Sequence, residues 1–208
     1  RGTRGDRDAR FDVPSRSVGR SADARGEGHA MAKPGFRERY AVEVPVVLAG
    51  MALVAEPGLV AAVTEAGGLG VLGTGPLPPP LVCERIAAVR ARTRGTFGVN
   101  QIVATTPLGA FTTTAGIGAL VEERVPFVVF HWDAPEPGWL ASLGAAGIRF
   151  WLTVTSVEEA RRAVAAGADA LVVQGVEAGG HNRSGEPLAR LIPRVAAVAG
   201  DLHVVAAG

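Results

Sequence analysis

The stretch ALVVQGVEAGGH, residues 170–181, decides the fold. It begins with the apolar run Leu171 to Val173, which is typical of a strand buried on both faces of a parallel sheet. It then becomes a loop with three glycines, a glutamine and a histidine, and glycine lets a backbone approach a ligand closely. Because α/β enzymes place reactive side chains in loops after parallel strands, the stretch predicts a functional site at the carboxyl edge of such a sheet.

The same alternation of a buried strand and a helix repeats along residues 45–208. The expected strands are residues 45–50, 69–73, 97–103, 126–132, 149–154, 170–175 and 203–208. Helical patterns lie between them, at residues 56–66, 81–92, 112–123, 137–146, 156–166 and 193–199. Ser156 and Glu159 have the spacing of a capping box at the start of the clearest of these helices. Serial strand–helix units predict a parallel sheet covered by helices.

Two α/β architectures compete for this pattern. A doubly wound open sheet usually stops at five or six strands and reverses its order, so seven units at steady spacing favour a (β/α)8 TIM barrel. A whole barrel needs about 250 residues, which is more than the regular part of this chain. We therefore expect a barrel truncated after its seventh strand, without its last helix, strand and helix.

Residues 1–38 have a different composition. Seven Arg and five acidic residues precede residue 30, and no hydrophobic period is present. Such a segment buries too little apolar area to offset the entropy lost on ordering. We expect a disordered Arg/Gly-rich extension over residues 1–38, followed by the barrel over residues 39–208. A further hypothesis is that Met31 is the native start.

Composition narrows the class of protein. The formal net charge of +1 gives no reason to expect a nucleic acid or a membrane surface as partner. The single cysteine, Cys83, cannot form an internal disulfide and suits a reducing compartment. Glu43, Glu56 and Pro57 interrupt the longest apolar run, so a membrane-spanning helix is not expected. We expect a cytoplasmic protein, a monomer or homodimer, that acts on small molecules.

The loops after the expected strands hold glycines, neutral amides and histidines. They contain no clustered Cys or His, so no metal is expected. They also lack a phosphate-binding lysine motif and a nucleophile elbow. Backbone N–H groups and amides suit a planar cofactor that bears a phosphate, and a histidine suits proton transfer.

Four stretches resemble a known family. They are AGMALVAEPGLVAAVTEAGGLGVLG (49–73), FGVNQIV (97–103), VVFHWDAP (128–135) and ADALVVQGVEAGGH (168–181). All resemble the nitronate monooxygenases, formerly called 2-nitropropane dioxygenases, which are FMN-dependent (β/α)8 enzymes. The resemblance covers residues 45–208, and the EAGGH box at residues 177–181 is its most specific part.

The resemblance implies a role for each candidate residue. His181 would be the catalytic base near the flavin N5, or the group that holds an anionic nitronate. His131 is a candidate for substrate contact, although a packed histidine is an equal alternative. The cofactor would be FMN, bound by residues in the turns after the strands: Ala49, Gly50, Met51, Asn100, Gln174, Gly179, Gly180 and Gly208.

Two features depart from the family pattern. Many relatives have proline where this chain has Gly50, which we interpret as loosening the turn. The segment HNRSGEP, residues 181–187, is less glycine-rich than usual.

The implied activity is oxidation of alkyl nitronates, such as propionate 3-nitronate, by O2 to a carbonyl compound and nitrite. One alternative is a flavin-dependent enoyl-acyl-carrier-protein reductase or NADH:quinone reductase, because related barrels carry a similar box. Another is an inactive barrel fragment, because the phosphate-binding loops of the family lie mostly beyond Gly208.

Overall fold

The computed structural model describes residues 34–107 and 109–208, and within them six strands form one parallel sheet. The sheet order is β1-β2-β5-β6-β7-β8. These strands are β1 (Gly70–Gly73), β2 (Phe97–Val103), β5 (Phe127–Trp132), β6 (Arg149–Val154), β7 (Ala170–Gln174) and β8 (His203–Ala207). A small antiparallel hairpin, β3 (Thr105–Thr106) and β4 (Gly109–Ala110), follows β2.

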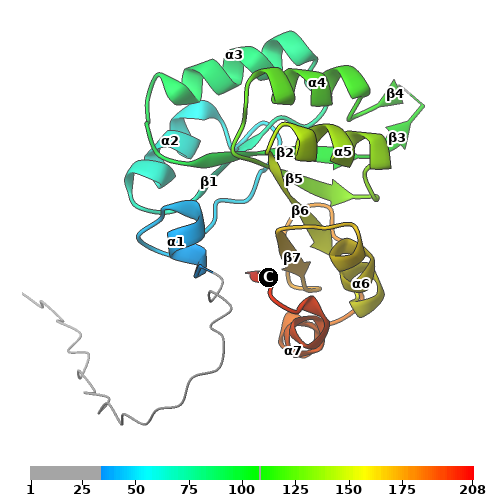
Figure 1. Ribbon diagram of the computed structural model, residues 1–208. Coiled ribbons are helices and arrows are strands. Elements are labelled where there is room, and N and C mark those ends of the chain that lie inside the picture. Colours follow the sequence, from blue (N-terminus) through cyan, green and yellow to red (C-terminus); the bar gives the residue numbers. More distant parts are fainter. Residues whose placement is uncertain (1–33, 108) are drawn as a thin grey trace, which may run out of the picture. The chain divides into compact units, whose positions relative to one another are not determined.

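Helices surround the sheet. The bounds are α1 (Phe36–Tyr40), α2 (Pro57–Glu65), α3 (Pro79–Arg90), α4 (Thr114–Glu122), α5 (Pro137–Ala145), α6 (Val157–Ala165) and α7 (Leu188–Ala199). Helices α2 to α7 lie around the outer face of the curved sheet, whereas α1 lies on its inner side (Figure 1).

The sequence of elements confirms the expected fold class. One helix separates each pair of successive strands in the sheet, and the strand order follows the chain order. A doubly wound sheet would reverse its order at a switch point, whereas a (β/α) barrel does not. The described residues therefore form a partial barrel, with β8 at one edge of the sheet.

The first expected strand, residues 45–50, is wrong. Val47 forms a single bridge with Leu69, supported by the bonds from Leu48 N–H to Leu69 O and from Leu69 N–H to Val46 O, both 2.9 Å. Pairing stops there because residues 49–51 turn over the carboxyl end of β1, with a 2.8 Å bond from Met51 N–H to Ala49 O.

The last expected helix begins five residues earlier than residue 193. Pro193 lies inside α7 rather than at its start. The amino end is set instead by Pro187 and by the Glu177 carboxylate, which accepts the Leu188 N–H at 3.0 Å. Because this contact joins residues on either side of a loop, the position of Pro193 in the sequence could not reveal where the helix begins.

The structure describes little of the expected N-terminal extension. Residues 1–33 lie outside the described part of the chain. The boundary expected at residue 38 falls inside α1, whose Tyr40 is 1% exposed. A five-residue helix is too short to show a hydrophobic period, so its existence depends on what it packs against.

The two faces of the sheet bury different sets of side chains. Because side chains alternate along a strand, one set packs against the outer helices and the other fills the concave inner face. The outer set includes Ile86, Val99, Leu120, Val128, Leu171 and Leu191. The inner set is Tyr40, Val42, Leu69, Val71, Phe127, Val129, Trp151 and Ala170.

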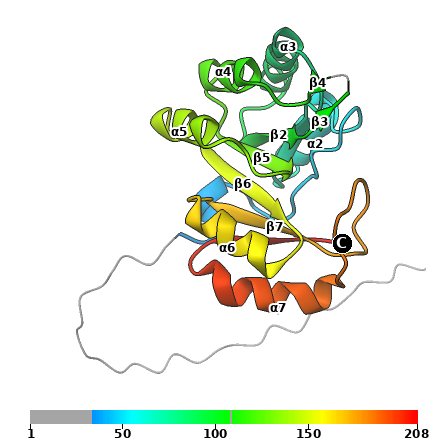
Figure 2. The same ribbon diagram turned by 90° about the vertical axis from the view of Figure 1, so that its right-hand side faces the viewer.

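Aromatic rings close the inner face at the amino ends of the strands. The Tyr40 ring lies 5.0 Å from Trp151 and 5.5 Å from Phe127, and the Trp151 Nε1–H donates to the Tyr40 hydroxyl at 2.9 Å. Figure 2 shows α1 at this end, and the loop after β7 and the C-terminal end at the other. The aromatic rings and α1 therefore do not cover the carboxyl ends of the strands.

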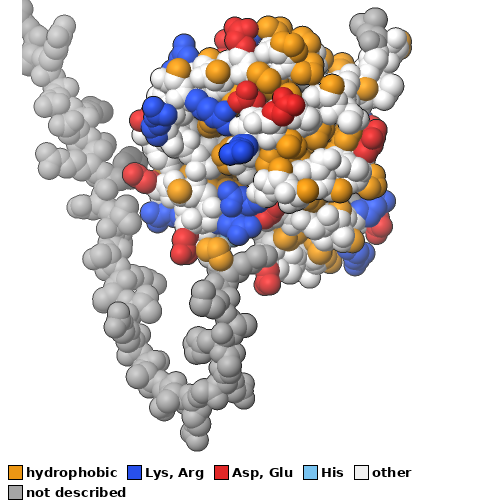
Figure 3. Space-filling model, turned by 45° about the horizontal axis from the view of Figure 1, so that its top comes forward, with side chains coloured by type: hydrophobic (Ala, Val, Ile, Leu, Met, Phe, Trp, Pro, Cys, Tyr) orange, Lys and Arg blue, Asp and Glu red, His pale blue; other side chains and the backbone are white. Residues whose placement is uncertain are grey.

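The surface carries charges of both signs. Acidic and basic side chains intermingle with apolar ones over the face shown in Figure 3, as the net charge of +1 leads one to expect. No helix in the described part of the chain has the length and hydropathy needed to cross a membrane.

We predict that Tyr40→Phe destabilises the protein. The substitution keeps the ring but leaves the buried Trp151 N–H without its acceptor, which costs about 1–3 kcal/mol of unfolding free energy. Urea denaturation of the parent chain and the variant measures this cost. A difference within about 0.3 kcal/mol would show that the bond contributes nothing.

Candidate active site

Polar side chains replace the aromatic layer towards the carboxyl edge of the inner face. Val129 belongs to the inner set, and Asn100 is its register partner on β2, so both side chains point to the same side. His131 follows Val129 by two residues and therefore points inward as well. On β7, Gln174 follows Val172 by two residues, and Val172 packs against the inner set. The Gln174 side chain therefore points inward too.

Two of these inner side chains are buried amides with unused hydrogen-bonding capacity. Asn100 is 8% and Gln174 is 7% exposed, and neither amide bonds to another described residue. The neighbouring Gln101, on the opposite face, donates to Thr74 Oγ1 at 2.8 Å and accepts from Thr112 Oγ1 at 3.1 Å. Among the described residues only Arg149 Nε is fully buried without a partner, so the polar atoms of the two inner amides still reach solvent and are open to a ligand.

The turn of residues 49–51 lies directly against Asn100. A Cβ placed on Gly50 would be 2.2 Å from the Asn100 Cβ, so a side chain at position 50 requires Asn100 to move. A Cβ on Gly73 would lie 2.1 Å from the Met51 carbonyl oxygen. The contact accounts for glycine at position 50, because the space beside Asn100 is closed to a Cβ. Ala49 and Met51 flank this contact, and both are exposed.

The loop after β7 is held by a residue that sequence reasoning missed. The Asn182 amide donates to Gly175 O at 2.7 Å, and its oxygen accepts the Ser184 N–H at 2.7 Å. The second bond is an Asx turn, for which an asparagine among glycines and serines is the sequence signal. Gly179 and Gly180 stay exposed at the loop tip, and Gly180 has a φ of +78°.

The structure brings the two candidate histidines together. His131 Nε2 lies 3.1 Å from the backbone oxygen of His181, and Trp132 Nε1 donates to the same oxygen at 3.4 Å. The rings of Trp132 and His181 meet edge to face at 4.9 Å. Trp132 is thus a rim residue that helps to hold the loop of His181.

An ion pair joins the same two loops on the outside. Arg183 Nη1 lies 2.7 Å from the Asp133 carboxylate, and the Arg183 guanidinium carbon lies 5.5 Å from the centre of the Trp132 ring. Both charged side chains are about half exposed, so the pair adds little stability. It does restrain where the loop after β7 lies relative to the end of β5.

A small pocket opens between these elements. Its lining joins the inner face to both loops and includes His131, Thr153, Thr155, Gln174 and Arg183. Glu159 fixes one wall, because its carboxylate accepts the Thr155 N–H at 2.6 Å and the Thr155 hydroxyl at 3.0 Å. The expected Ser156 cap is present, with Glu159 N–H donating to Ser156 Oγ at 3.1 Å.

Gly208 lies beside the amino end of α7. A Cβ on Gly208 would meet Leu188 Cδ2 at 2.7 Å. Gly208 follows Ala207, the register partner of Gln174, so it reaches the same edge of the sheet. Glu177 has a structural role here, because its carboxylate accepts the Leu188 N–H at the start of α7. The same bond holds the pKa of the Glu177 carboxyl below its usual value.

Burial lowers the pKa of His131. Desolvation is the main cause, and the nearby Arg183 and His181 lower the pKa further, whereas the bond to the His181 carbonyl opposes them. The imidazole is therefore neutral at pH 7, with the Nε2 proton directed to the His181 oxygen.

We predict that His131 titrates below the ordinary histidine value of about 6.5. The ring's NMR resonances, followed from pH 8 to pH 4 and assigned with His131→Gln, give its midpoint. Because the folded pKa is lowered, protonation favours the unfolded state, and the linked stability is lost as pH falls below about 6.5. His131→Gln should therefore lose less stability than the parent between pH 7 and pH 5. A midpoint at or above about 6.5 contradicts this account.

Comparison with known proteins gives consistent matches over this part of the chain. Residues 35–208 match the family model described as nitronate monooxygenase. A nitronate monooxygenase of Paraburkholderia phytofirmans is 33% identical over an alignment of 179 residues, and the match covers 70% of this chain and 49% of the relative. A probable nitronate monooxygenase of Staphylococcus aureus is 31% identical over an alignment of 177 residues, and the match covers 71% of this chain and 50% of the relative.

Two solved structures are equally similar in fold. FabK from Thermotoga maritima has a TM-score of 0.74 and 32% identity, with 82% of this chain and 52% of that chain covered. A nitroalkane oxidase from Streptomyces ansochromogenes has a TM-score of 0.74 and 33% identity, covering 79% and 58%. The chain spans about half the length of the curated relatives it matches.

Proposed function

The chain belongs to the nitronate monooxygenase family, and from that premise we propose that it serves FMN-dependent oxidation of alkyl nitronates by O2. The products would be a carbonyl compound and nitrite, and propionate 3-nitronate is the substrate to test first. The partners would be small molecules, with the protein acting as a monomer or homodimer in the cytoplasm.

The observation that carries the proposal is a pair of inner-face amides, Asn100 and Gln174, that hydrogen-bond no other described residue. Asn100 and Gln174 face the inner side of the sheet at its carboxyl edge, where a barrel enzyme binds its cofactor. An amide can both donate and accept, which matches the alternating donors and acceptors of a flavin ring. The residues present therefore fit a flavin, and we propose that these two amides hydrogen-bond it.

Glycines support the same proposal from the backbone side. The turn at Gly50 lies against Asn100, and Gly208 lies one residue beyond the partner of Gln174. A ligand held by these amides would also contact the backbone of the turn at residues 49–51. Gly179 and Gly180 lie on the loop after β7, where the absence of side chains leaves their N–H groups accessible.

Bound FMN would supply the electron acceptor, and His181 would handle the proton. The His181 carbonyl is fixed by His131 and Trp132, so the ring is presented from an anchored backbone. We propose that His181 removes the α-proton of a neutral nitroalkane, or holds the nitronate anion when the substrate arrives deprotonated. His131 would act as a positioning residue, because its Nε2 is directed to the His181 oxygen.

Enoyl-thioester or quinone reduction stays the alternative. The FabK and nitroalkane oxidase structures match this chain with the same TM-score, so similarity of fold does not rank the two activities. An inactive fragment is the third possibility, and it predicts no flavin binding at all.

We predict that Gln174→Met weakens FMN binding about tenfold without destabilising the ligand-free protein, since the lost amide bonds only the ligand. Gln101→Met is the matched control. Its amide bonds to Thr74 and Thr112, so this variant should lower the free energy of unfolding and leave FMN affinity nearly unchanged. Flavin fluorescence titration and thermal melts measure both quantities. Equal FMN affinity for Gln174→Met and the parent would contradict the proposed site.

We predict that His181→Ala affects neutral nitroalkanes far more than nitronates. A missing base should lower kcat/KM for nitroethane by about a hundredfold or more. Propionate 3-nitronate is already deprotonated, so its oxidation should fall much less. His131→Gln retains a donor towards the His181 oxygen and serves as the control, with small and similar losses for both substrates.

Oxygen uptake and nitrite release by the FMN-loaded protein report this activity. NADH oxidation with an enoyl thioester or a quinone, together with no O2 uptake on nitronate, would support the alternative and overturn the proposal.

A further inference from the structure

A second pocket lies at the opposite end of the sheet. It has a volume of about 300 Å3 and opens between the turn after α3 and the turn after α4, at the amino ends of β2 and β5. Its lining includes Arg90, Arg94, Thr96, Phe97, Arg124 and Pro126. Strand β5 has six residues, so roughly 20 Å separate this pocket from the carboxyl edge at a rise of about 3.3 Å per residue.

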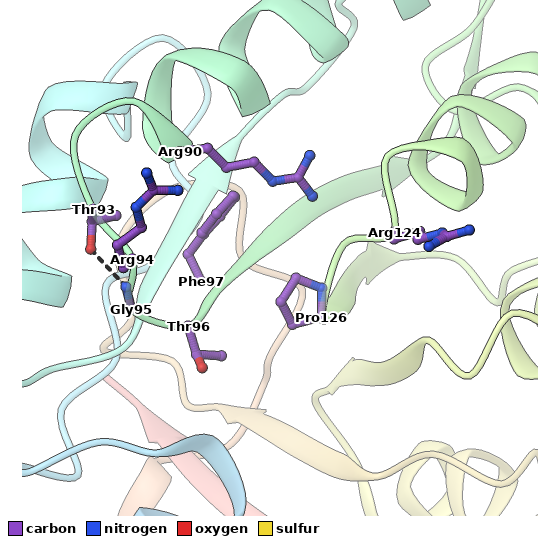
Figure 4. A pocket seen from close by; sticks show the side chains of 8 residues that line it. All are labelled: Arg90, Thr93, Arg94, Gly95, Thr96, Phe97, Arg124 and Pro126. Atoms are coloured by element: carbon purple, nitrogen blue, oxygen red, sulfur yellow. Dashed lines mark hydrogen bonds between the residues drawn. The ribbon is translucent and has the colours of Figure 1, made fainter.

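Three arginines are among the residues that line this pocket. Figure 4 shows Arg94 to the left of Phe97, the Arg90 guanidinium above and to the right of it, and Arg124 beyond Pro126 with its side chain turned away from Phe97. Arg90 is neutralised, because Nη1 lies 2.6 Å from the Glu123 carboxylate and Nη2 donates to the Glu123 carbonyl. Arg94 and Arg124 form no salt bridge with any other described residue. The pocket thus has an excess of positive charge.

The turn that carries Arg94 is fixed from both sides. The Thr93 hydroxyl accepts the Gly95 N–H at 3.0 Å and donates to the Glu65 carboxylate at 2.5 Å. Thr93 is 6% exposed, so this bridge is shielded from water. The backbone of residue 94 is therefore held in place while its side chain is exposed.

Arg124 occupies a position where this fold otherwise uses glycine. Helices α2, α5 and α6 end in the same turn as α4, with matching backbone bonds. The residue of positive φ is Gly67 (83°), Gly147 (71°) and Gly167 (82°) in those helices, but Arg124 (48°) after α4. A residue with a Cβ is unfavourable there, so the arginine is placed against the local backbone preference.

We propose that this pocket binds the phosphate group of a small molecule. Guanidinium groups bind phosphate through charge-assisted, often bidentate, bonds. Arg94 provides one such group from a fixed turn, and the exposed Arg124 side chain needs only a rotation to provide a second. Phe97 and Pro126 form an apolar wall that suits the carbon part of a phosphate ester.

Phosphate binding to the full chain tests this inference independently of flavin binding, because all lining residues lie away from the carboxyl edge. Inorganic phosphate and glycerol 3-phosphate would be titrated at low salt, with binding followed by NMR shifts of Gly95 and Thr96. We expect saturable binding that weakens as NaCl is added. Tighter binding of glycerol 3-phosphate identifies an ester as the ligand, and equal binding identifies the free anion.

The variants Arg94→Gln and Arg124→Gly should each weaken binding about fivefold or more, since each removes a charge-assisted bond. Arg124→Gly also suits the positive φ, so its Tm should equal or exceed that of the parent, which separates lost binding from lost folding. Arg161→Gln, on the exposed face of α6, is the matched control and should not change affinity. Unchanged affinity in both pocket variants, or an equal loss in Arg161→Gln, would overturn the inference.

Discussion

All strand pairings in the main sheet are parallel, and this constraint organises the rest of the structure. Parallel strands direct every carboxyl end to one edge, so loops distant in sequence converge there. They also need cover on both faces, because both sides of each strand are apolar. The outer cover comes from the six helices α2 to α7, and the inner cover at the amino edge comes from α1 and the aromatic rings near it.

The inner face changes character along the strands. At the amino edge, the rings of Tyr40, Phe127 and Trp151 pack together and exclude water. Towards the carboxyl edge, the same face presents the amides of Asn100 and Gln174. The polar atoms of these amides still reach solvent, so leaving them without a protein partner costs the fold little. A ligand at the carboxyl edge would satisfy what the fold leaves open.

The loop after β7 shows how an exposed segment can still present a side chain in a defined place. Asn182 closes it internally, and His131 and Trp132 hold the carbonyl of His181 from the neighbouring strand. The Arg183–Asp133 pair spans the same two elements on the outside. Few of these contacts are apolar, so the geometry depends on hydrogen bonds to fixed backbone groups.

The sequence by itself determined the succession of strands and helices, because apolar runs, caps and terminal glycines are local signals. It predicted β2 and β6 at their observed bounds, the Ser156 cap, and the family through the EAGGH box.

Tertiary structure alone decided the rest. The segment 45–50 is a single bridge because a turn removes it from β1, and α7 begins at Leu188 because Glu177 reaches it across a loop. Two contacts join residues that are 50 positions apart in sequence. His131 bonds the His181 carbonyl, and Gly50 lies against Asn100. Such contacts follow from the register of the sheet, which no local pattern encodes.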